Sequence, residues 1–292
     1  MSAALTTMDA WAGPRAGAAV LGPGGAVRAV HGGTDEPLPW ASVTKLVTAS
    51  LVLLAVEAGS LELDEPAGPP GATVRHLLAH ASGLGFEGET PISAPARTRI
   101  YSNAGYDALG RILEARTGRP LAEHMRTAFL EPLGMVGTAL VGRAGEGLSG
   151  PLEDLVRLAA ELVRPAVLPP GRLREATRVA YPGLAGVLPG FGRYDPLDWG
   201  LGFELRDAKA GHWTGTLAAP STFGHFGGSG AAVWVDPVAG IALALLSDRA
   251  FGPWAVSAWP AFSDAVERVG RAAVPSAGGD PPAGAVRHPA DR

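Results

Sequence analysis

The chain has 292 residues, of which 47% are hydrophobic and 18% are charged, a balance typical of globular proteins rather than disordered ones. Its formal net charge of −4 offers no electrostatic basis for binding nucleic acid. Because it contains no cysteine, it has neither a disulfide framework nor a thiolate metal site.

The sequence carries no export or membrane signal that we recognise. The first nine residues have neither the basic nor the apolar segment of a secretory signal peptide. The apolar run 46–58 is too short to cross a bilayer, and Gly59 follows it directly. We therefore expect a cytoplasmic protein with no membrane and no nucleic-acid partner, and the oligomeric state stays open.

An N-terminal hairpin and a series of helices are predicted for the first half of the chain. The hairpin consists of residues 18–21 and 26–30, on either side of a glycine-rich turn. Thr73 and Asn103 can each cap the start of a helix, and Gly118 can end one. Helices are predicted over residues 46–58, 74–79, 104–117, 121–129 and 149–163.

The last part of the chain returns to strands. Residues 165–194 are rich in proline and glycine and predict loops with at most a short helix. Residues 254–272 predict a terminal helix, and the composition of the tail 275–292 predicts disorder. Strands are predicted over residues 199–205, 222–226, 231–235 and 241–246.

Together these elements predict an α/β (α+β) fold in a single domain, residues 1–274. Strands from both ends of the chain, within about 11–40 and 200–274, would pair in one antiparallel sheet flanked by helices. A mainly helical region, about 41–199, would be inserted between them.

Ser42 and Lys45 form the first candidate for chemistry. Lys45 is one of only two lysines in the chain, and it follows Ser42 by three residues at the start of the buried helix. This spacing puts both side chains on one helix face, as a nucleophile with a base beside it. In dry surroundings such a lysine loses its proton easily. The structural alternative is that Ser42 is a helix cap and Lys45 a surface residue.

Two further segments complete a recognisable pattern. Ser42-Val-Thr-Lys45, Tyr101-Ser-Asn103 and His225-Phe-Gly227 resemble the three motifs of serine β-lactamases and penicillin-binding proteins. The chain is most similar to the branch with a tyrosine in the second motif, which holds class C β-lactamases, D-Ala-D-Ala carboxypeptidases, D-aminopeptidases and related esterases. The matching stretches occur in the family's order, at residues 41–45, 73–84, 101–106, 132–135, 199–203 and 223–228.

The resemblance implies a β-lactamase/transpeptidase-like fold and an acyl-enzyme mechanism. Ser42 would attack an acyl carbonyl, and Lys45 would accept the hydroxyl proton or hold the base in place. Tyr101 would act as a phenolate base and then protonate the leaving group, which requires a pKa well below its ordinary value of about 10. Asn103 would hold Lys45 and the substrate carbonyl. Alternatively, Asn103 is only a helix cap and Tyr101 only a buried aromatic residue.

The third motif would supply the opposite wall of the site. The resemblance implies an oxyanion hole formed by the backbone N–H groups of Ser42 and Gly228, next to Gly227. His225 would add a positive charge or a hydrogen bond, although a histidine in a strand can also be purely structural. Phe226 stands where peptidases and β-lactamases of this branch carry Thr or Ser, so it can offer a substrate only an apolar face or point away. Arg249 is a candidate replacement as a partner for an anion.

His76 and His80 are spaced like a metal-binding pair on a helix. No glutamate lies between them in the H-E-x-x-H pattern and no third ligand is evident, so we expect neither a metal nor a cofactor. The resemblance implies instead that His80 ties down the turn at Ser82-Gly83.

These features predict a serine hydrolase that acts on small esters or amides, with acyl transfer as a possible outcome of the same intermediate. Phe226 argues against a wall peptidase or a resistance β-lactamase. The alternatives are a D-amino-acid-specific peptidase or weak β-lactamase, and a non-catalytic module that binds acyl groups or penicillin.

Overall fold

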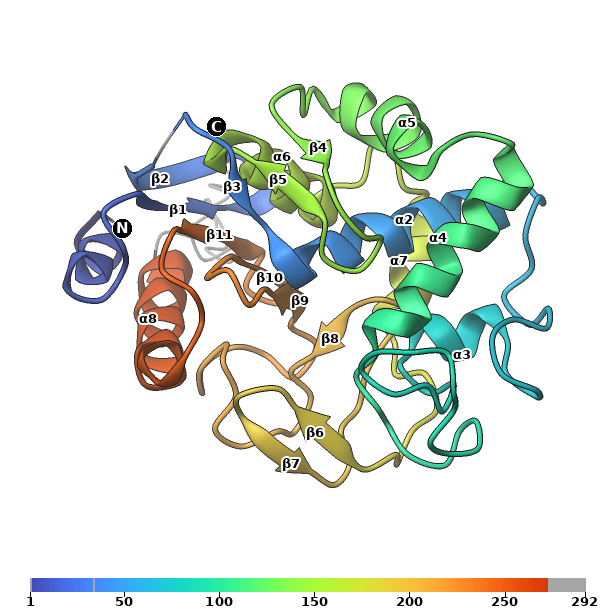
Figure 1. Ribbon diagram of the computed structural model, residues 1–292. Helices are drawn as coiled ribbons and strands as arrows, with labels where there is room; N and C mark the ends of the chain where they lie inside the picture. The colour runs from blue at the N-terminus through green and yellow to red at the C-terminus, as the bar shows by residue number, and fades with distance from the viewer. Residues whose placement is uncertain (1, 34, 273–292) are drawn as a thin grey trace, which may run out of the picture.

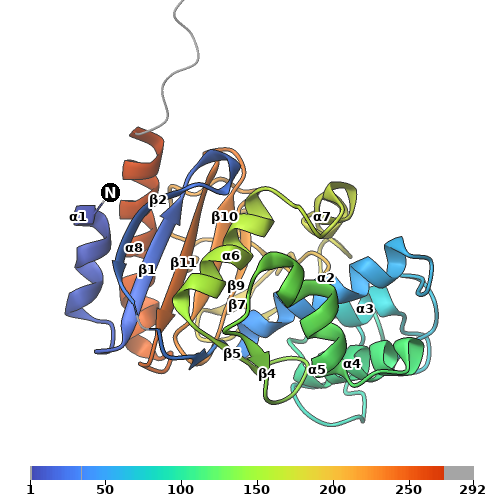
Figure 2. The same cartoon turned by 90° about the horizontal axis from the view of Figure 1, so that it is seen from above.

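A six-stranded antiparallel sheet forms one side of the molecule (Figures 1 and 2). The computed structural model describes residues 2–33 and 35–272, so the predicted tail 275–292 lies outside the described residues. The sheet has the order β2-β1-β11-β10-β9-β8, and it confirms the prediction of one sheet built from both ends of the chain. Its strands are β1 (Ala16–Leu21), β2 (Val27–Gly32), β8 (Glu204–Leu205), β9 (Phe223–Phe226), β10 (Ala232–Asp236) and β11 (Ile241–Ser247).

Helices cover both faces of this sheet. The terminal helix α8 (Pro253–Ala272) and the short α1 (Ser2–Leu5) lie on one face, and α6 (Leu152–Val163) lies on the other (Figure 2). Side chains of β1 alternate between the two cores, because successive residues of a strand point to opposite faces. Ala18 and Val20 join the cluster under α8, whereas Ala19 and Leu21 join the larger cluster under α6.

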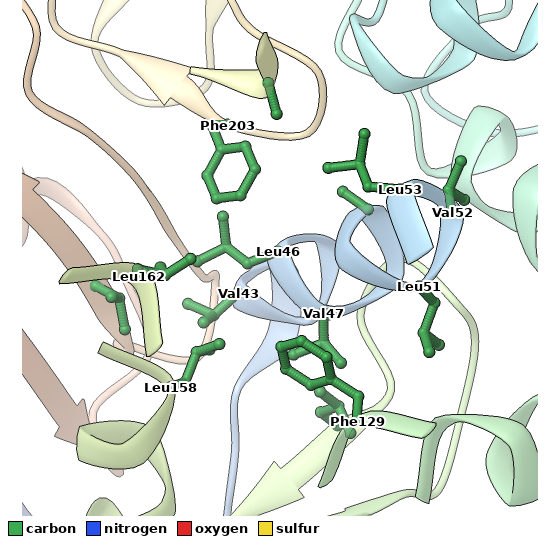
Figure 3. Packing of buried hydrophobic residues seen from close by; sticks show 14 of the residues in the cluster. Val43, Leu46, Val47, Leu51, Val52, Leu53, Phe129, Leu158, Leu162 and Phe203 are labelled. Carbon is green, nitrogen blue, oxygen red and sulfur yellow. The ribbon is translucent and has the colours of Figure 1, made fainter. Parts of the chain in front are cut away.

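The helical region packs around α2 (Thr44–Glu57) at its centre (Figure 1). From Thr44 to Leu53 every residue of this helix is buried, as the largely apolar or small residues of this run predict. Its side chains meet Phe129 on one side and Phe203 on another (Figure 3). Around it lie α3 (Val74–Leu78), α4 (Asn103–Thr117), α5 (Leu121–Met125) with a π-helical turn at Arg126–Leu130, and α7 (Pro170–Ala176).

The structure differs from the sequence-based expectation in a few short elements. A hairpin of β6 (Gly186–Leu188) and β7 (Gly192–Tyr194) lies where only loops and a short helix were expected. The predicted strand 199–205 is reduced to β8, whose two residues pair with β9. A small sheet of β3 (Leu38–Pro39), β5 (Leu148–Gly150) and β4 (Ala139–Leu140) was not foreseen, and β5 takes Ser149 out of the helix that we assigned to it.

The start of α4 also corrects the expected helix cap. Ser102 is the N-cap, and its hydroxyl accepts a hydrogen bond from the backbone N–H of Gly105 at 3.0 Å. Asn103 is the first residue of the helix, so its side chain is free to take other partners. Within the described ranges, no helix is long and apolar enough to cross a membrane.

Candidate active site

Ser42 lies in a tight turn between the sheet region and α2. The turn, Ala41–Val43, runs directly into the helix, so Ser42 and Lys45 share one helix face. Ala41 has a φ of 45°, a left-handed conformation that is strained for any residue with a Cβ and that recurs at functional sites. Ser42 is partly exposed, whereas Lys45 is completely buried. Ser42 is therefore accessible to solvent, whereas the side chain of Lys45 is shielded from water.

The amine of Lys45 is surrounded by three oxygen atoms. Nζ lies 3.1 Å from Ser42 Oγ, 2.6 Å from Asn103 Oδ1 and 2.8 Å from the carbonyl oxygen of Gly145. Burial lowers the pKa of Lys45 to about 7, and the charge of Glu146 offsets only part of this effect. Near neutral pH a large fraction of the amine is therefore uncharged. An uncharged amine has two N–H groups and one lone pair.

This arrangement determines where the lone pair of the uncharged amine points. The amide oxygen of Asn103 and the carbonyl oxygen of Gly145 can only accept hydrogen bonds, so they take the two N–H groups. The lone pair is left for the Ser42 hydroxyl, which can donate. The geometry therefore suits transfer of the hydroxyl proton from Ser42 to Lys45.

Tyr101 reaches the same point from the segment before α4. Lys45 Nζ lies 4.8 Å from the centre of its ring, and its hydroxyl lies 3.4 Å from His225 Nε2. Although part of the residue is exposed, removal of water from around the hydroxyl raises the pKa of Tyr101, and a hydrogen bond with Ser42 opposes this only in part. The expected fall in this pKa is therefore not found, and the phenol is neutral in this arrangement.

His225 on β9 is neutral as well. Burial, followed by the nearby charge of Lys45, lowers the pKa of His225 to about 3. Its Nδ1 lies 2.7 Å from the carbonyl oxygen of Phe226, which can only accept, so Nδ1 carries the proton and Nε2 faces Tyr101 as an acceptor. Of the two roles expected for His225, the geometry favours the hydrogen bond over the positive charge.

Phe226 points away from the site. Its ring packs against Trp213 and Phe251, with centroid distances of 5.3 and 5.1 Å, in the core under α8. Since neighbours on a strand face opposite ways, His225 and Phe226 cannot both face Ser42. The guanidinium of Arg249 donates to the carbonyl oxygen of Trp11 at 2.6 Å and stacks on Trp254.

The two glycines after Phe226 have different positions. A Cβ on Gly227 would overlap the carbonyl oxygen of Trp40 and lie 3.2 Å from Ser42 N, so only glycine lets β9 come this close to the nucleophile. The N–H of Gly227 donates to Ala231 O at 2.8 Å. In the described part of the chain, the N–H groups of Ser42 and Gly228 have no hydrogen-bond acceptor. These two groups, and not the N–H of Gly227, are available to an oxyanion.

Asn103 has all its hydrogen-bonding groups occupied. Its oxygen accepts from Lys45, and its Nδ2 donates to Glu87 at 3.2 Å and to Glu146 at 3.0 Å. A substrate carbonyl would have to displace one of these carboxylates to bind Asn103 as the resemblance implies. Sequence reasoning missed both glutamates, which lie in loops with no pattern of their own. Arg143 forms ion pairs with both of them.

His76 and His80 have separate partners and do not form a pair. His76 accepts a hydrogen bond from the backbone N–H of Thr73 in a capping box at the start of α3. Nδ1 of His80 accepts from the backbone N–H of Ser102 at 3.1 Å, so His80 contacts the second motif rather than the turn at Ser82 that the resemblance implied.

Comparisons with known proteins identify the family of this chain. The model of the β-lactamase family matches residues 6–266. A crystal structure of a β-lactamase from Mycobacterium bovis is 46% identical, with a TM-score of 0.89 and coverage of 92% of this chain and 99% of the other. Penicillin-binding protein 4 from Amycolatopsis lactamdurans is 26% identical over an aligned length of 287 residues. The match covers 74% of this chain and 73% of that protein.

An esterase is also among the relatives. Esterase EstB from Burkholderia gladioli is 31% identical over 161 residues, which cover 39% of this chain and 41% of the esterase. The match thus spans less than half of that enzyme's length. The fold, the order of the motifs and the extent of the family match agree, and the chain belongs to the β-lactamase family of serine hydrolases.

Proposed function

We propose that this protein hydrolyses small esters or amides through an acyl-enzyme on Ser42. The observation that carries the proposal is the contact between Ser42 Oγ and Lys45 Nζ at 3.1 Å, with Lys45 fully buried and its pKa lowered to about 7. A general base is most effective when its pKa is near the working pH.

In the first step Lys45 acts as the base. The uncharged amine takes the hydroxyl proton as Ser42 Oγ forms a bond to the acyl carbon. The carbonyl oxygen becomes an oxyanion, which the N–H groups of Ser42 and Gly228 stabilise. Removal of one such donor typically costs on the order of 10²–10³ in turnover.

In the second step Tyr101 acts as an acid. As the bond between the acyl carbon and the leaving group breaks, the neutral phenol gives its proton to the leaving oxygen or nitrogen. The Lys45 ammonium then returns a proton to the phenolate, which restores both groups. Attack by water on the acyl-enzyme reverses these roles and releases the acid, whereas attack by an alcohol would give acyl transfer.

The third motif favours substrates without a carboxylate. Phe226 supplies no hydroxyl and packs into the core, and Arg249 is bound to Trp11. Phe226 thus offers no hydroxyl to the carboxylate of a β-lactam or a D-Ala-D-Ala peptide. A neutral ester or amide does not require one.

Labelling with a fluorescent fluorophosphonate tests the nucleophile. We expect the wild type to be labelled and the Ser42→Ala variant to be unlabelled, whereas an unlabelled wild type would favour a non-catalytic binding module. Hydrolysis of p-nitrophenyl butyrate, nitrocefin and a D-Ala-D-Ala peptide then separates the substrate classes. Turnover of nitrocefin or the peptide at a rate matching the ester would contradict the argument from Phe226 and support a β-lactamase or peptidase.

A further inference from the structure

We propose that His80 is a positioning residue, which holds the Tyr101-Ser102-Asn103 segment in place beside Ser42 and Lys45. The proposal rests on the function proposed above, since it concerns the same site. His80 lies just beyond the end of α3, is 1% exposed, and has no part in the chemical steps described so far.

Two hydrogen bonds connect His80 to both neighbours of Tyr101. The carbonyl oxygen of His80 accepts from the backbone N–H of Ile100 at 2.9 Å. Its Nδ1 accepts from the backbone N–H of Ser102 at 3.1 Å. The residues directly before and after Tyr101 are therefore fixed to one buried residue, which leaves the Tyr101 backbone little freedom to shift.

The ring of His80 also supports the Tyr101 side chain. The two ring centroids are 4.6 Å apart, and Tyr106 and Trp199 complete an aromatic cage around the imidazole at 5.2 and 5.0 Å. Tyr101 is thus held at its backbone and at its ring by the same side chain. A shift of His80 would move the phenol relative to Ser42.

The imidazole must be neutral to play this part. Burial, followed by the charge of Lys45, holds the pKa of His80 well below its ordinary value. Because Nδ1 accepts from Ser102, the proton of the neutral ring is on Nε2. Nε2 is buried and has no hydrogen-bond partner among residues 2–33 and 35–272. Of the two ring nitrogens, only the acceptor at Nδ1 has a function in the described contacts.

The backbone at His80 decides which substitutions are informative. Its φ is 54°, in the left-handed region, which histidine and asparagine tolerate better than apolar residues do. Asparagine can place its side-chain oxygen near the position of Nδ1. Leucine branches at the same atom as asparagine and has as many side-chain heavy atoms, but it has no acceptor.

The experiment therefore compares His80→Asn with His80→Leu. We expect the Asn variant to retain a kcat for p-nitrophenyl butyrate close to that of the wild type. For the Leu variant we expect a kcat lower by about 10²-fold, as for a small misplacement of a reacting group, with little change in KM. His76→Leu is the matched control, because it makes the same change one helical turn earlier, outside the site.

Two further measurements keep a loss of folding apart from a loss of positioning. Thermal unfolding shows whether each variant is folded at the assay temperature. Hydrogen exchange at the Ser102 amide reports its bond to His80 directly, and we expect protection in the wild type and His80→Asn but rapid exchange in His80→Leu. This readout remains valid if the wild type hydrolyses no ester, in which case the proposed function fails and the role of His80 is still tested.

The proposal is wrong if folded His80→Leu keeps the kcat of the wild type, or if its Ser102 amide stays protected. It is also wrong if folded His80→Asn is as slow as His80→Leu, because an acceptor at this position would then not matter.

Discussion

The amine of Lys45 lies 3.1 Å from the hydroxyl oxygen of Ser42, and its other two hydrogen-bond partners can only accept. Lys209, the second lysine of the chain, is also buried but lies 3.0 Å from the carboxylate of Glu204. The difference between the two sites is chemical. Among the residues that the structure describes, no carboxylate contacts Lys45 directly, so burial favours its uncharged form, which is the form that can act as a base.

Replacement of Lys45 by methionine should remove the base while preserving much of the packing. We expect kcat/KM for p-nitrophenyl butyrate to fall by about 10²–10⁴-fold, the range typical of general-base catalysis. Circular dichroism and thermal unfolding establish that the variant is folded. A folded Lys45→Met enzyme with near wild-type activity would eliminate Lys45 as the base.

The activity of the wild type should depend on the protonation of Lys45. Because its pKa is lowered to about 7, kcat/KM should rise with pH through this region as the ammonium loses its proton. The measurement is a pH profile between about pH 5.5 and 9 in buffers of constant ionic strength. A profile without any change across this range would contradict the assignment.

The same pKa predicts a change of stability with pH. In the unfolded chain Lys45 has its ordinary pKa of about 10.4, so between about pH 7 and 10.4 the unfolded state binds a proton that the folded state releases. The contribution of Lys45 to the free energy of unfolding therefore rises with pH across this window and is constant below it. Urea unfolding of the wild type and of Lys45→Met at several pH values measures this contribution. The free energy of unfolding of the wild type, relative to that of the variant, should increase with pH across this window.

Tyr101→Phe should affect substrates according to their leaving groups. A p-nitrophenolate leaves without needing a proton near neutral pH, whereas an alkoxide from an alkyl ester requires one. We expect the variant to lose much more kcat/KM, which reports the acylation step, on ethyl butyrate than on p-nitrophenyl butyrate, with losses of about 10²–10⁴-fold on the alkyl ester. Equal losses on both esters would show that Tyr101 does not protonate the leaving group.

Gly227→Ala should separate β9 from the nucleophile. The added Cβ would overlap the Trp40 carbonyl oxygen, so the strand must move and the oxyanion hole opens. We expect a loss of about 10²–10³-fold in kcat. Gly171→Ala is the matched control, because a Cβ there meets only the end of an arginine side chain at 3.9 Å and the site is remote. Wild-type kcat in Gly227→Ala would show that the close approach is not required.

Lys209→Met should reduce stability rather than chemistry. Lys209 is paired with Glu204, whose carboxylate also contacts His212 and Trp213 in the core. Burial alone would raise the pKa of Glu204, but His212 and Lys209 more than offset it and lower it to about 2. Loss of one partner of a buried ion pair typically costs about 3–5 kcal/mol, which urea unfolding measures. An unchanged unfolding midpoint would contradict this account.

The sequence predicted the long elements and the chemistry-bearing motifs because each has a strong local signal. The structure contains the predicted buried helix as α2 and the predicted strand pair as β10 and β11. Residues of the three motifs lie together at one site. The hairpin β6–β7 and the small sheet β3-β5-β4 consist of two- and three-residue strands, which are too short for a periodic pattern.

What the sequence could not supply is the electrostatic state of the site. The mechanism implied by the resemblance required a lowered pKa for Tyr101, and a positive charge was one of the two roles open to His225, but burial opposes both. Glu87 and Glu146 contact Asn103 only because two loops converge on it. Such contacts depend on tertiary structure, so no local sequence pattern predicts them.

The pairing of β1 with β11 also constrains how the enzyme is made on the ribosome. Ala16 lies opposite Ser247, so more than two hundred further residues must be synthesised before β1 can pair with β11. Ser42, Lys45 and Tyr101 emerge long before β9 and Gly228, and a nascent chain that stops short of them has a nucleophile but no oxyanion hole. Activity should therefore arise only near the end of translation, as a late and abrupt event rather than a gradual one.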